Sequence, residues 1–207
     1  LGFEVSVVDD LSTGLHPDEW PAATKLTRQE LHELDFQHRD VRQYFQSLTM
    51  GAEFDIVFHC AAVVGGRRTI EGNPLYVATD LSIDAEFFNW CMSSMPRRVV
   101  YFSSSAVYPV ELQRRSLHVS LSESIVNFNG NRINMPDMTY GWSKLTGEYL
   151  MQHAVKGGLQ CVCYRPFSGY GADQSLDYPF PSIIKRVVEK QDPITIWGSG
   201  NQVRDFI

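Results

Sequence analysis

Five short apolar runs alternate along this chain with longer segments of helical spacing, and this alternation constrains the fold more than any other feature. The runs are rich in Val, Ile, Phe and Cys and occupy residues 4–9, 33–36, 55–62, 97–105 and 159–167. Their length fits strands, and apolar residues recur at helical spacing near 38–50, 73–95, 138–157 and 178–191. Near-continuous apolar strands that alternate with helices predict an α/β fold, a doubly wound parallel sheet covered on both faces.

The composition is that of a soluble globular chain with one core. It has 207 residues, of which 43% are apolar, and a formal net charge of −6. This acidic balance argues against nucleic acid and against an anionic membrane surface as partners. No apolar run approaches the roughly 20 residues of a membrane span, and the first residues do not indicate a signal peptide, so we expect a cytoplasmic protein.

The four cysteines indicate neither a metal site nor a disulfide framework. They form no CxxC pair, and no histidines cluster with them at ligand spacing. We therefore expect no metal. Cys161 and Cys163 alternate along one predicted strand, which favours a place in the core for both.

The chain changes character near residue 166. Residues 1–165 carry the alternating pattern and are predicted to form one domain, whereas residues 166–207 begin with a segment rich in Gly, Pro and aromatics. We expect this second part to begin a substrate-facing region. The irregular stretch 110–137 is too long for an ordinary connection, which predicts a functional segment or an insertion.

Polar or small residues close each predicted strand. In sheets of this class ligands bind outside the carboxyl ends of the strands, so these residues are expected to form one continuous site. A carboxylate after the first run suits the ribose hydroxyls of an adenosine and repels a 2′-phosphate, which favours NAD over NADP. The strand-end residues are Asp9 and Asp10, Asp35, Ala61 and Ala62, Ser103 to Ser105, and Ser168.

Tyr140 and Lys144 stand four residues apart in a predicted helix. That spacing places both on one helix face, about one turn apart. A phenol with a pKa of about 10 is a poor base at neutral pH, and a neighbouring ammonium group lowers this pKa by favouring the phenolate. The pair therefore indicates an acid-base centre close to the strand-end serines.

Five motifs together resemble the extended short-chain dehydrogenase/reductase family, in particular its NAD-dependent nucleotide-sugar epimerases and dehydratases. The motifs are VVDDLSTG, VFHCAA, FSSSAVYP, YGWSK and ITIWGSGNQVRDFI, and the likeness runs from Leu1 to Ile207. It implies that residues 1–165 are an NAD-binding Rossmann-like domain whose glycine-rich loop, first strand and first helix lie before Leu1. The remainder of the substrate-binding region would follow Ile207.

The resemblance implies a role for each matching residue. Tyr140 would take a proton from a sugar hydroxyl while the carbon gives a hydride to NAD, Ser104 would position that proton, and Lys144 would hold the nicotinamide ribose. The implied cofactor contacts are Asp9, Asp10, Asp35, Phe36, Ala61, Ala62, Ser103, Tyr140 and Lys144. The implied substrate contacts are Ser105, Ser168 and Arg204, and the substrate is a nucleotide-diphosphate sugar.

Departures from the family pattern bear on the reaction. Dehydratases of the family carry Asp and Glu directly after the Ser or Thr, where this chain has Ser105 and Ala106. The resemblance therefore implies an isomerase that epimerises the sugar, commonly at C4, or else a ketosugar reductase. Asp80 stands where the family usually has Asn, so no cofactor role is expected for it.

Other outcomes stay open at this point. They are a dehydratase or decarboxylase of the same family and a non-catalytic dinucleotide-binding sensor or scaffold. The family often pairs through the helix that carries the Tyr and Lys, which makes a homodimer possible.

Overall fold

Short parallel strands form the centre of the molecule. The computed structural model describes residues 3–20, 27–32, 34–48, 54–113, 119–130, 132–171, 174–196 and 198–201. The strands are β1 (Ser6–Asp9), β2 (Asp35–His38), β3 (Val57–His59), β4 (Val99–Phe102) and β5 (Cys161–Tyr164). Each lies within or beside one of the five predicted runs, and every pairing is parallel, as the sequence predicts.

The four predicted helical segments are helical. They correspond to α2 (Val41–Ser47), α4 (Pro74–Val77) with α5 (Thr79–Ser94), α6 (Met138–Lys156) and α7 (Pro179–Val188). The sequence pattern does not predict the short helices α1 (Arg28–His32) and α3 (Arg67–Gly72). Short 3-10 turns occur at η1 (Pro17–Glu19), η2 (Ser105–Val107), η3 (Val110–Leu112) and η4 (Glu123–Ile125).

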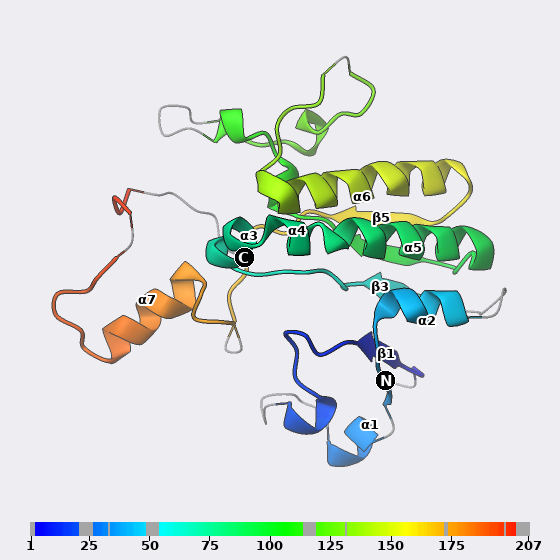
Figure 1. The fold of residues 1–207 in the computed structure, drawn as a ribbon, viewed down its shortest axis with the longest axis horizontal. Helices are drawn as coiled ribbons and strands as arrows, with labels where there is room; N and C mark the ends of the chain where they lie inside the picture. Colours follow the sequence, from blue (N-terminus) through cyan, green and yellow to red (C-terminus); the bar gives the residue numbers. More distant parts are fainter. Residues whose placement is uncertain are drawn as a thin grey trace.

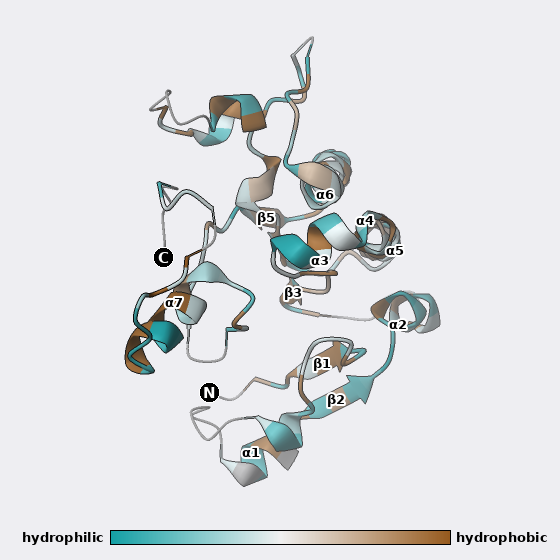
Figure 2. Ribbon diagram, turned by 60° about the vertical axis from the view of Figure 1, so that its left-hand side comes forward, coloured by the Kyte–Doolittle hydropathy of each residue, from teal (hydrophilic) through white to brown (hydrophobic). Residues whose placement is uncertain are grey.

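The strands form two separate sheets among the described residues. One contains β1 and β2, and the other has the order β3-β4-β5. Figure 2 shows β1 and β2 lying apart from β3. The single continuous sheet implied by the strand pattern is therefore not what the described residues form.

Helices cover one face of the β3-β4-β5 sheet. Helices α5 and α6 lie side by side over it, and Phe45 of α2 and Phe87 of α5 pack with Tyr101 of β4 in one aromatic core (Figure 1). On the other face Phe58, Val162 and Tyr164 are 62%, 43% and 55% exposed. The described helices therefore leave part of this second face uncovered. The alternation of side chains explains why successive residues of β5 differ in burial.

A polar chain crosses this core. His59 Nε2 lies 2.9 Å from Asp84 Oδ1, and the Tyr101 hydroxyl donates to Asp84 Oδ2 at 2.6 Å. All three side chains are buried, so each bond satisfies a group that would otherwise be costly to bury. Together they tie α5 to β3 and β4.

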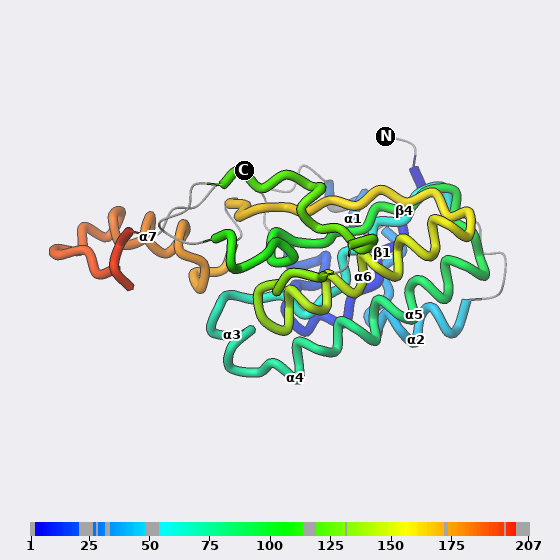
Figure 3. Tube along the Cα trace, turned by 90° about the horizontal axis from the view of Figure 1, so that it is seen from above, coloured from blue at the N-terminus to red at the C-terminus, as the bar shows by residue number. Residues whose placement is uncertain are grey.

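The last helix extends away from these layers. Figure 3, seen from above, shows α7 projecting beyond the end of α6. No helix in the described part of the chain is long and apolar enough to cross a membrane.

Gly147 of α6 sits against the polar chain, and we predict that it cannot be enlarged. A Cβ there would collide with the Tyr101 hydroxyl and with Asp84 Oδ2. We expect Gly147→Ala to lower the free energy of unfolding by about 1–3 kcal/mol, as overpacked cores do. Urea denaturation of the full-length protein measures this change in the free energy of unfolding. Gly72→Ala is the control, because nothing lies within 4 Å of its added Cβ; equal losses from the two variants would contradict this packing.

Candidate functional site

The carboxyl ends of β3, β4 and β5 lie at the same side of the molecule as the N-terminal ends of α5 and α6. Figure 1 shows this side at the left of the sheet, together with α3. The arrangement follows from topology, because each parallel strand runs out at this edge before the chain returns as a helix. The loops at this edge carry most of the candidate residues.

Ser104 and Tyr140 come together there. Ser104 caps η2, its Oγ accepting a hydrogen bond from Ala106 N at 3.1 Å, and Tyr140 lies in the first turn of α6. The two turns are joined tightly, because Asp137 N donates to Ala106 O at 2.8 Å and a Cβ on Gly141 would lie 2.5 Å from that oxygen. The Ser104 hydroxyl lies close enough to the Tyr140 phenol to lower the pKa of that phenol.

Lys144 lies beneath this pair. It is only 3% exposed, and its Nζ lies 5.9 Å from the centre of the Tyr140 ring and 5.5 Å from that of Tyr101. Tyr140 and Lys144 therefore share one face of α6, as their spacing predicts. The ammonium group rests over two aromatic faces, an arrangement that the ring quadrupoles favour.

The electrostatics of Tyr140 differ from the prediction. Burial raises the pKa of Tyr140 to about 12, the Asp80 carboxylate adds to the rise, and the hydrogen bond with Ser104 opposes it. The sequence predicts instead that Lys144 lowers this pKa. That prediction is wrong for the described structure, because withdrawal of the phenol from water disfavours the phenolate more than nearby groups stabilise it.

Asp80 is the functional candidate that the sequence pattern misses. It lies in the first turn of α5, is 1% exposed, and accepts a hydrogen bond from Val63 N at 2.6 Å through Oδ1. Its Oδ2 has no hydrogen-bond partner among the described residues. Burial raises the pKa of this carboxyl to about 6, whereas the Val63 N–H and the Lys144 charge lower it. Its departure from the family's usual Asn is the signal that marks it.

The three strand-end serines have different surroundings. The Ser103 hydroxyl is buried and donates to Glu148 Oε1 at 2.5 Å, and Glu148 pairs with Arg165 at 2.7 Å. Ser103 therefore faces into α6, and its hydroxyl is not directed to the open edge as the resemblance implies. Ser105 begins η2, is partly exposed, and donates its N–H to Pro166 O at 3.1 Å.

The other candidate cofactor residues follow β1 and β3. The carboxylates of Asp9 and Asp10 are exposed and accept the N–H groups of Leu11 and Ser12 at 2.7 and 2.9 Å. They therefore stabilise the turn after β1 and keep their outward lone pairs accessible. Ala61 and Ala62 follow β3 and are half-buried.

Asp35 does not lie at this edge, which corrects the prediction. It opens β2 rather than closing it, pairing with Ser6, and its carboxylate accepts from Ser6 Oγ at 2.7 Å. Phe36 packs edge-on against the His16 ring, with centroids 4.9 Å apart. The acid after the strand is Asp40, which caps α2 and pairs with Arg42. Its position directly before a helical pattern is the signal that could have identified it.

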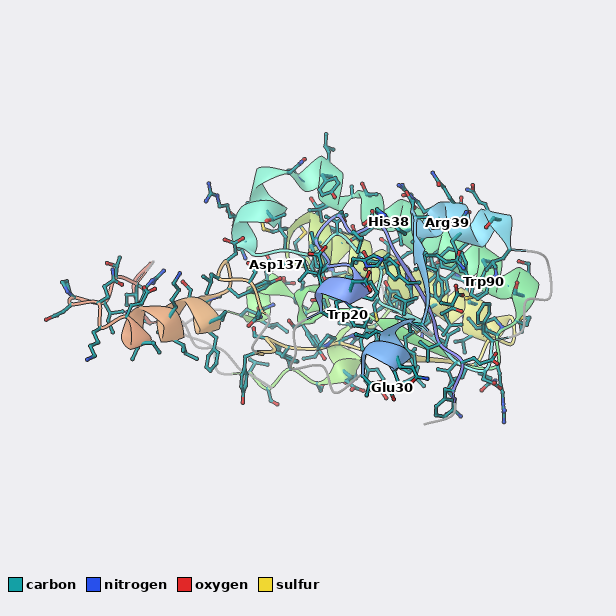
Figure 4. All side chains as sticks on the ribbon, turned by 90° about the horizontal axis from the view of Figure 1, so that it is seen from below. Trp20, Glu30, His38, Arg39, Trp90 and Asp137 are labelled. Carbon is teal, nitrogen blue, oxygen red and sulfur yellow. The ribbon has the colours of Figure 1, made fainter. Side chains whose placement is uncertain are left out.

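The substrate candidates are only partly described. Ser168 lies four residues beyond β5 and is half-buried, and Arg204 falls outside the described residues. The loop after β3 approaches the segment ahead of α7, because a Cβ on Gly66 would lie 3.1 Å from Asp177 O. Arg67 of α3 also pairs with Asp137 at 3.0 Å, and Figure 4 labels Asp137 on the side of the main body from which α7 projects.

Two further features of the described residues concern ligands. A cavity of about 440 Å³ is lined by residues 124–128 and 132–134 together with Val107 and Leu145, and neither Ser104 nor Tyr140 is among its lining residues. No group of three or more His, Cys, Asp or Glu side chains within the described ranges is arranged to hold a metal ion.

Comparisons with known proteins find a matching family and several relatives of this chain. A family model described as "NAD dependent epimerase/dehydratase family" matches residues 1–207. The chain is 34% identical over 156 residues to the "Uncharacterized UDP-glucose epimerase YtcB" of Bacillus subtilis, covering 73% of this chain and 44% of that protein. It is 27% identical to a Streptomyces "dTDP-4-dehydro-6-deoxy-D-allose reductase", covering 88% and 54%. The chain thus spans about half the length of these curated relatives.

Solved structures show the same fold. A Bacillus cereus UDP-glucuronic acid 4-epimerase in complex with UDP-glucuronic acid and NAD has a TM-score of 0.66 and 26% identity, covering 86% of this chain and 54% of that one. A UDP-N-acetylglucosamine 4-epimerase from Methanobrevibacter ruminantium has a TM-score of 0.70 at 24% identity, covering 99% and 61%. These matches confirm the predicted Rossmann-like α/β class.

The buried carboxyl of Asp80 generates a prediction about stability. Burial raises its pKa from the ordinary 3.8 to about 6, so the folded state holds the proton more tightly and loses stability as the pH rises from about 4 to about 6. We expect Asp80→Asn to raise the free energy of unfolding at neutral pH by about 2 kcal/mol, the pKa difference less the cost of burying an amide.

The gain should vanish below about pH 4, where the carboxyl is protonated in both states. Urea denaturation at both pH values measures it, with Asp55→Asn as the exposed control. A loss of stability at neutral pH would show that the ionised carboxylate is well accommodated.

Proposed function

We propose, from the premise that this chain belongs to the NAD dependent epimerase/dehydratase family, that it contributes the reacting centre of an enzyme that epimerises a nucleotide-diphosphate sugar at C4. The observation that carries the proposal is the placement of Ser104 beside Tyr140, with buried Lys144 at the Tyr140 ring. A hydroxyl, a phenol and an ammonium group at one sheet edge suit proton transfer to and from a sugar hydroxyl. The relatives named for UDP-glucose epimerase and UDP-glucuronic acid 4-epimerase support this substrate class.

NAD is the proposed cofactor. The exposed carboxylates of Asp9 and Asp10 are suited to accept hydrogen bonds from ribose hydroxyls and to repel a 2′-phosphate. The small side chains of Ala61 and Ala62 leave room for a ligand to approach the backbone after β3. When bound, NAD supplies a hydride acceptor that later returns the hydride to the sugar.

Tyr140 acts as the acid and base in this proposal. With a pKa of about 12 it holds its proton at neutral pH in the described structure. It can therefore donate that proton directly, whereas its role as base requires a bound ligand to lower the pKa. Ser104 lies beside Tyr140 and orients the transferred proton, and Lys144 supplies positive charge at the Tyr140 ring.

The turn after Ser104 favours epimerisation over elimination. The Ala106 side chain cannot act as an acid or a base. The backbone N–H of Ser105, the residue before it, donates to Pro166 O. A ketosugar reductase is the second candidate, supported by the Streptomyces reductase relative. A binding protein without turnover is the alternative of a different class.

Three further predictions accompany this proposal. The region from residue 166 onward begins the substrate-binding part, with Ser168 and Arg204 among its contacts. The protein works in the cytoplasm, and it pairs as a homodimer through α6. Ser103 is better suited to hold α6 through Glu148 than to contact a cofactor.

Removing the Tyr140 hydroxyl should abolish most of the turnover. We expect Tyr140→Phe to lower kcat about 100- to 10,000-fold while NAD binding is retained, because only proton transfer is lost. The full-length protein is mixed with NAD and a panel of UDP-, GDP- and dTDP-sugars, and products are followed by NMR. Tyr149→Phe is the matched control, since Tyr149 lies on the same helix but is exposed.

The product identifies the reaction. An isomeric sugar that the Tyr140→Phe variant fails to make supports the epimerase. A reduced, deoxy or pentose product would contradict epimerisation, and tightly bound NAD without turnover would favour a binding role.

A further inference from the structure

We infer that Asp80 is a positioning residue that keeps negative charge on the inner wall of the site and so controls when Tyr140 ionises. The inference rests on the proposed function only in taking Tyr140 as the acid and base. The burial and contacts of Asp80 are independent of that assignment. The roles expected from the sequence motifs assign no function to Asp80.

The Asp80 carboxylate is held rigidly but incompletely satisfied. Its place in the first turn of α5 and the 2.6 Å bond from Val63 N to Oδ1 fix the side chain. Its Oδ2 is buried and has no hydrogen-bond partner among the described residues. A buried carboxylate oxygen without a donor retains its full influence on neighbouring charges, because neither water nor a hydrogen bond screens it.

The next acid along α5 differs in this respect. Asp84 lies one turn further on and gives both oxygens to the core, one to His59 and one to Tyr101. Both of its oxygens therefore have buried hydrogen-bond partners. Among the described residues, Asp80 has only the Val63 N–H as a donor, so its second oxygen has none.

Several titratable groups surround Asp80 on the elements packed around it. The charge of Lys144 lowers the pKa of Asp80, whereas that of Asp84 raises it. Asp80 in turn raises the pKa of Tyr140. The charged and titratable groups that act on Asp80, or on which it acts, are Tyr140 and Lys144 of α6 and Asp84 of α5.

Asp80 adds to the effect of burial at Tyr140. Burial of the phenol is the larger cause of its raised pKa, and the Asp80 carboxylate raises that pKa further. Lys144 Nζ lies 5.9 Å from the centre of the Tyr140 ring, and its positive charge opposes that of the Asp80 carboxylate. Neutralising Asp80 should remove the part of the rise that its charge causes.

The test measures the ionisation of Tyr140 directly. The full-length protein and Asp80→Asn are labelled with ¹³C in the tyrosine rings, and the Tyr140 resonance is assigned from its loss in Tyr140→Phe. We expect the titration midpoint of Tyr140 to fall by about 1 pH unit or more in Asp80→Asn. At the highest pH at which both proteins stay folded, its ionised fraction should be about tenfold larger.

Glu86→Gln is the matched control. Glu86 is a half-buried acid on the same helix whose charge acts on Arg42, so removing it should leave the Tyr140 midpoint unchanged. A purely structural role of Asp80 would leave the midpoint unchanged in Asp80→Asn as well, and that result, or a rise, would overturn the inference. Asp80→Ser, also neutral, carries the same test if the Asn variant does not fold.

Activity separates this inference from the proposed function. In an active enzyme the rising limb of the pH–rate profile should move to lower pH in Asp80→Asn, by the same shift as the Tyr140 midpoint. A shifted midpoint in a protein that turns over no nucleotide sugar would support the role of Asp80 and contradict the epimerase proposal. An unshifted midpoint in an active enzyme would support the epimerase proposal and contradict the role of Asp80.

Discussion

The hydrogen-bonded chain of His59, Asp84 and Tyr101 is the constraint on which the rest of this structure depends. It links β3, α5 and β4 inside a core that offers these polar groups no water. Gly147 lets α6 pack directly onto the same chain. Because α5 and α6 are held in this way, their N-terminal turns carry Asp80 and Tyr140 to the edge where β4 ends.

The same packing sets the chemistry of the candidate site. Burial that stabilises the helices also withdraws Tyr140 and Asp80 from water, which raises the pKa of both. An ionised Asp80 therefore costs stability where a neutral residue would not. Retaining such a residue is consistent with the general tendency of functional sites to keep groups that the fold alone would not select.

Sequence patterns predicted the helices and parallel strands because hydrophobic period and run length report directly on burial. They also placed Tyr140 and Lys144 on one face of α6, since helical spacing decides that. They misplaced Asp35, because a short run with mixed polarity does not reveal at which residue a strand begins. They could not show that Ser103 turns toward Glu148 or that burial outweighs Lys144 at Tyr140, since both depend on packing between distant segments.

A crystal structure of the full-length protein with NAD and a UDP-sugar would test the central claim most directly. The account predicts that the C4 hydroxyl of the sugar lies within about 3 Å of the Tyr140 phenol, with the Ser104 hydroxyl beside it. A sugar bound elsewhere, for example in the cavity lined by residues 124–128 and 132–134, with Tyr140 and Ser104 in contact only with each other, would contradict it.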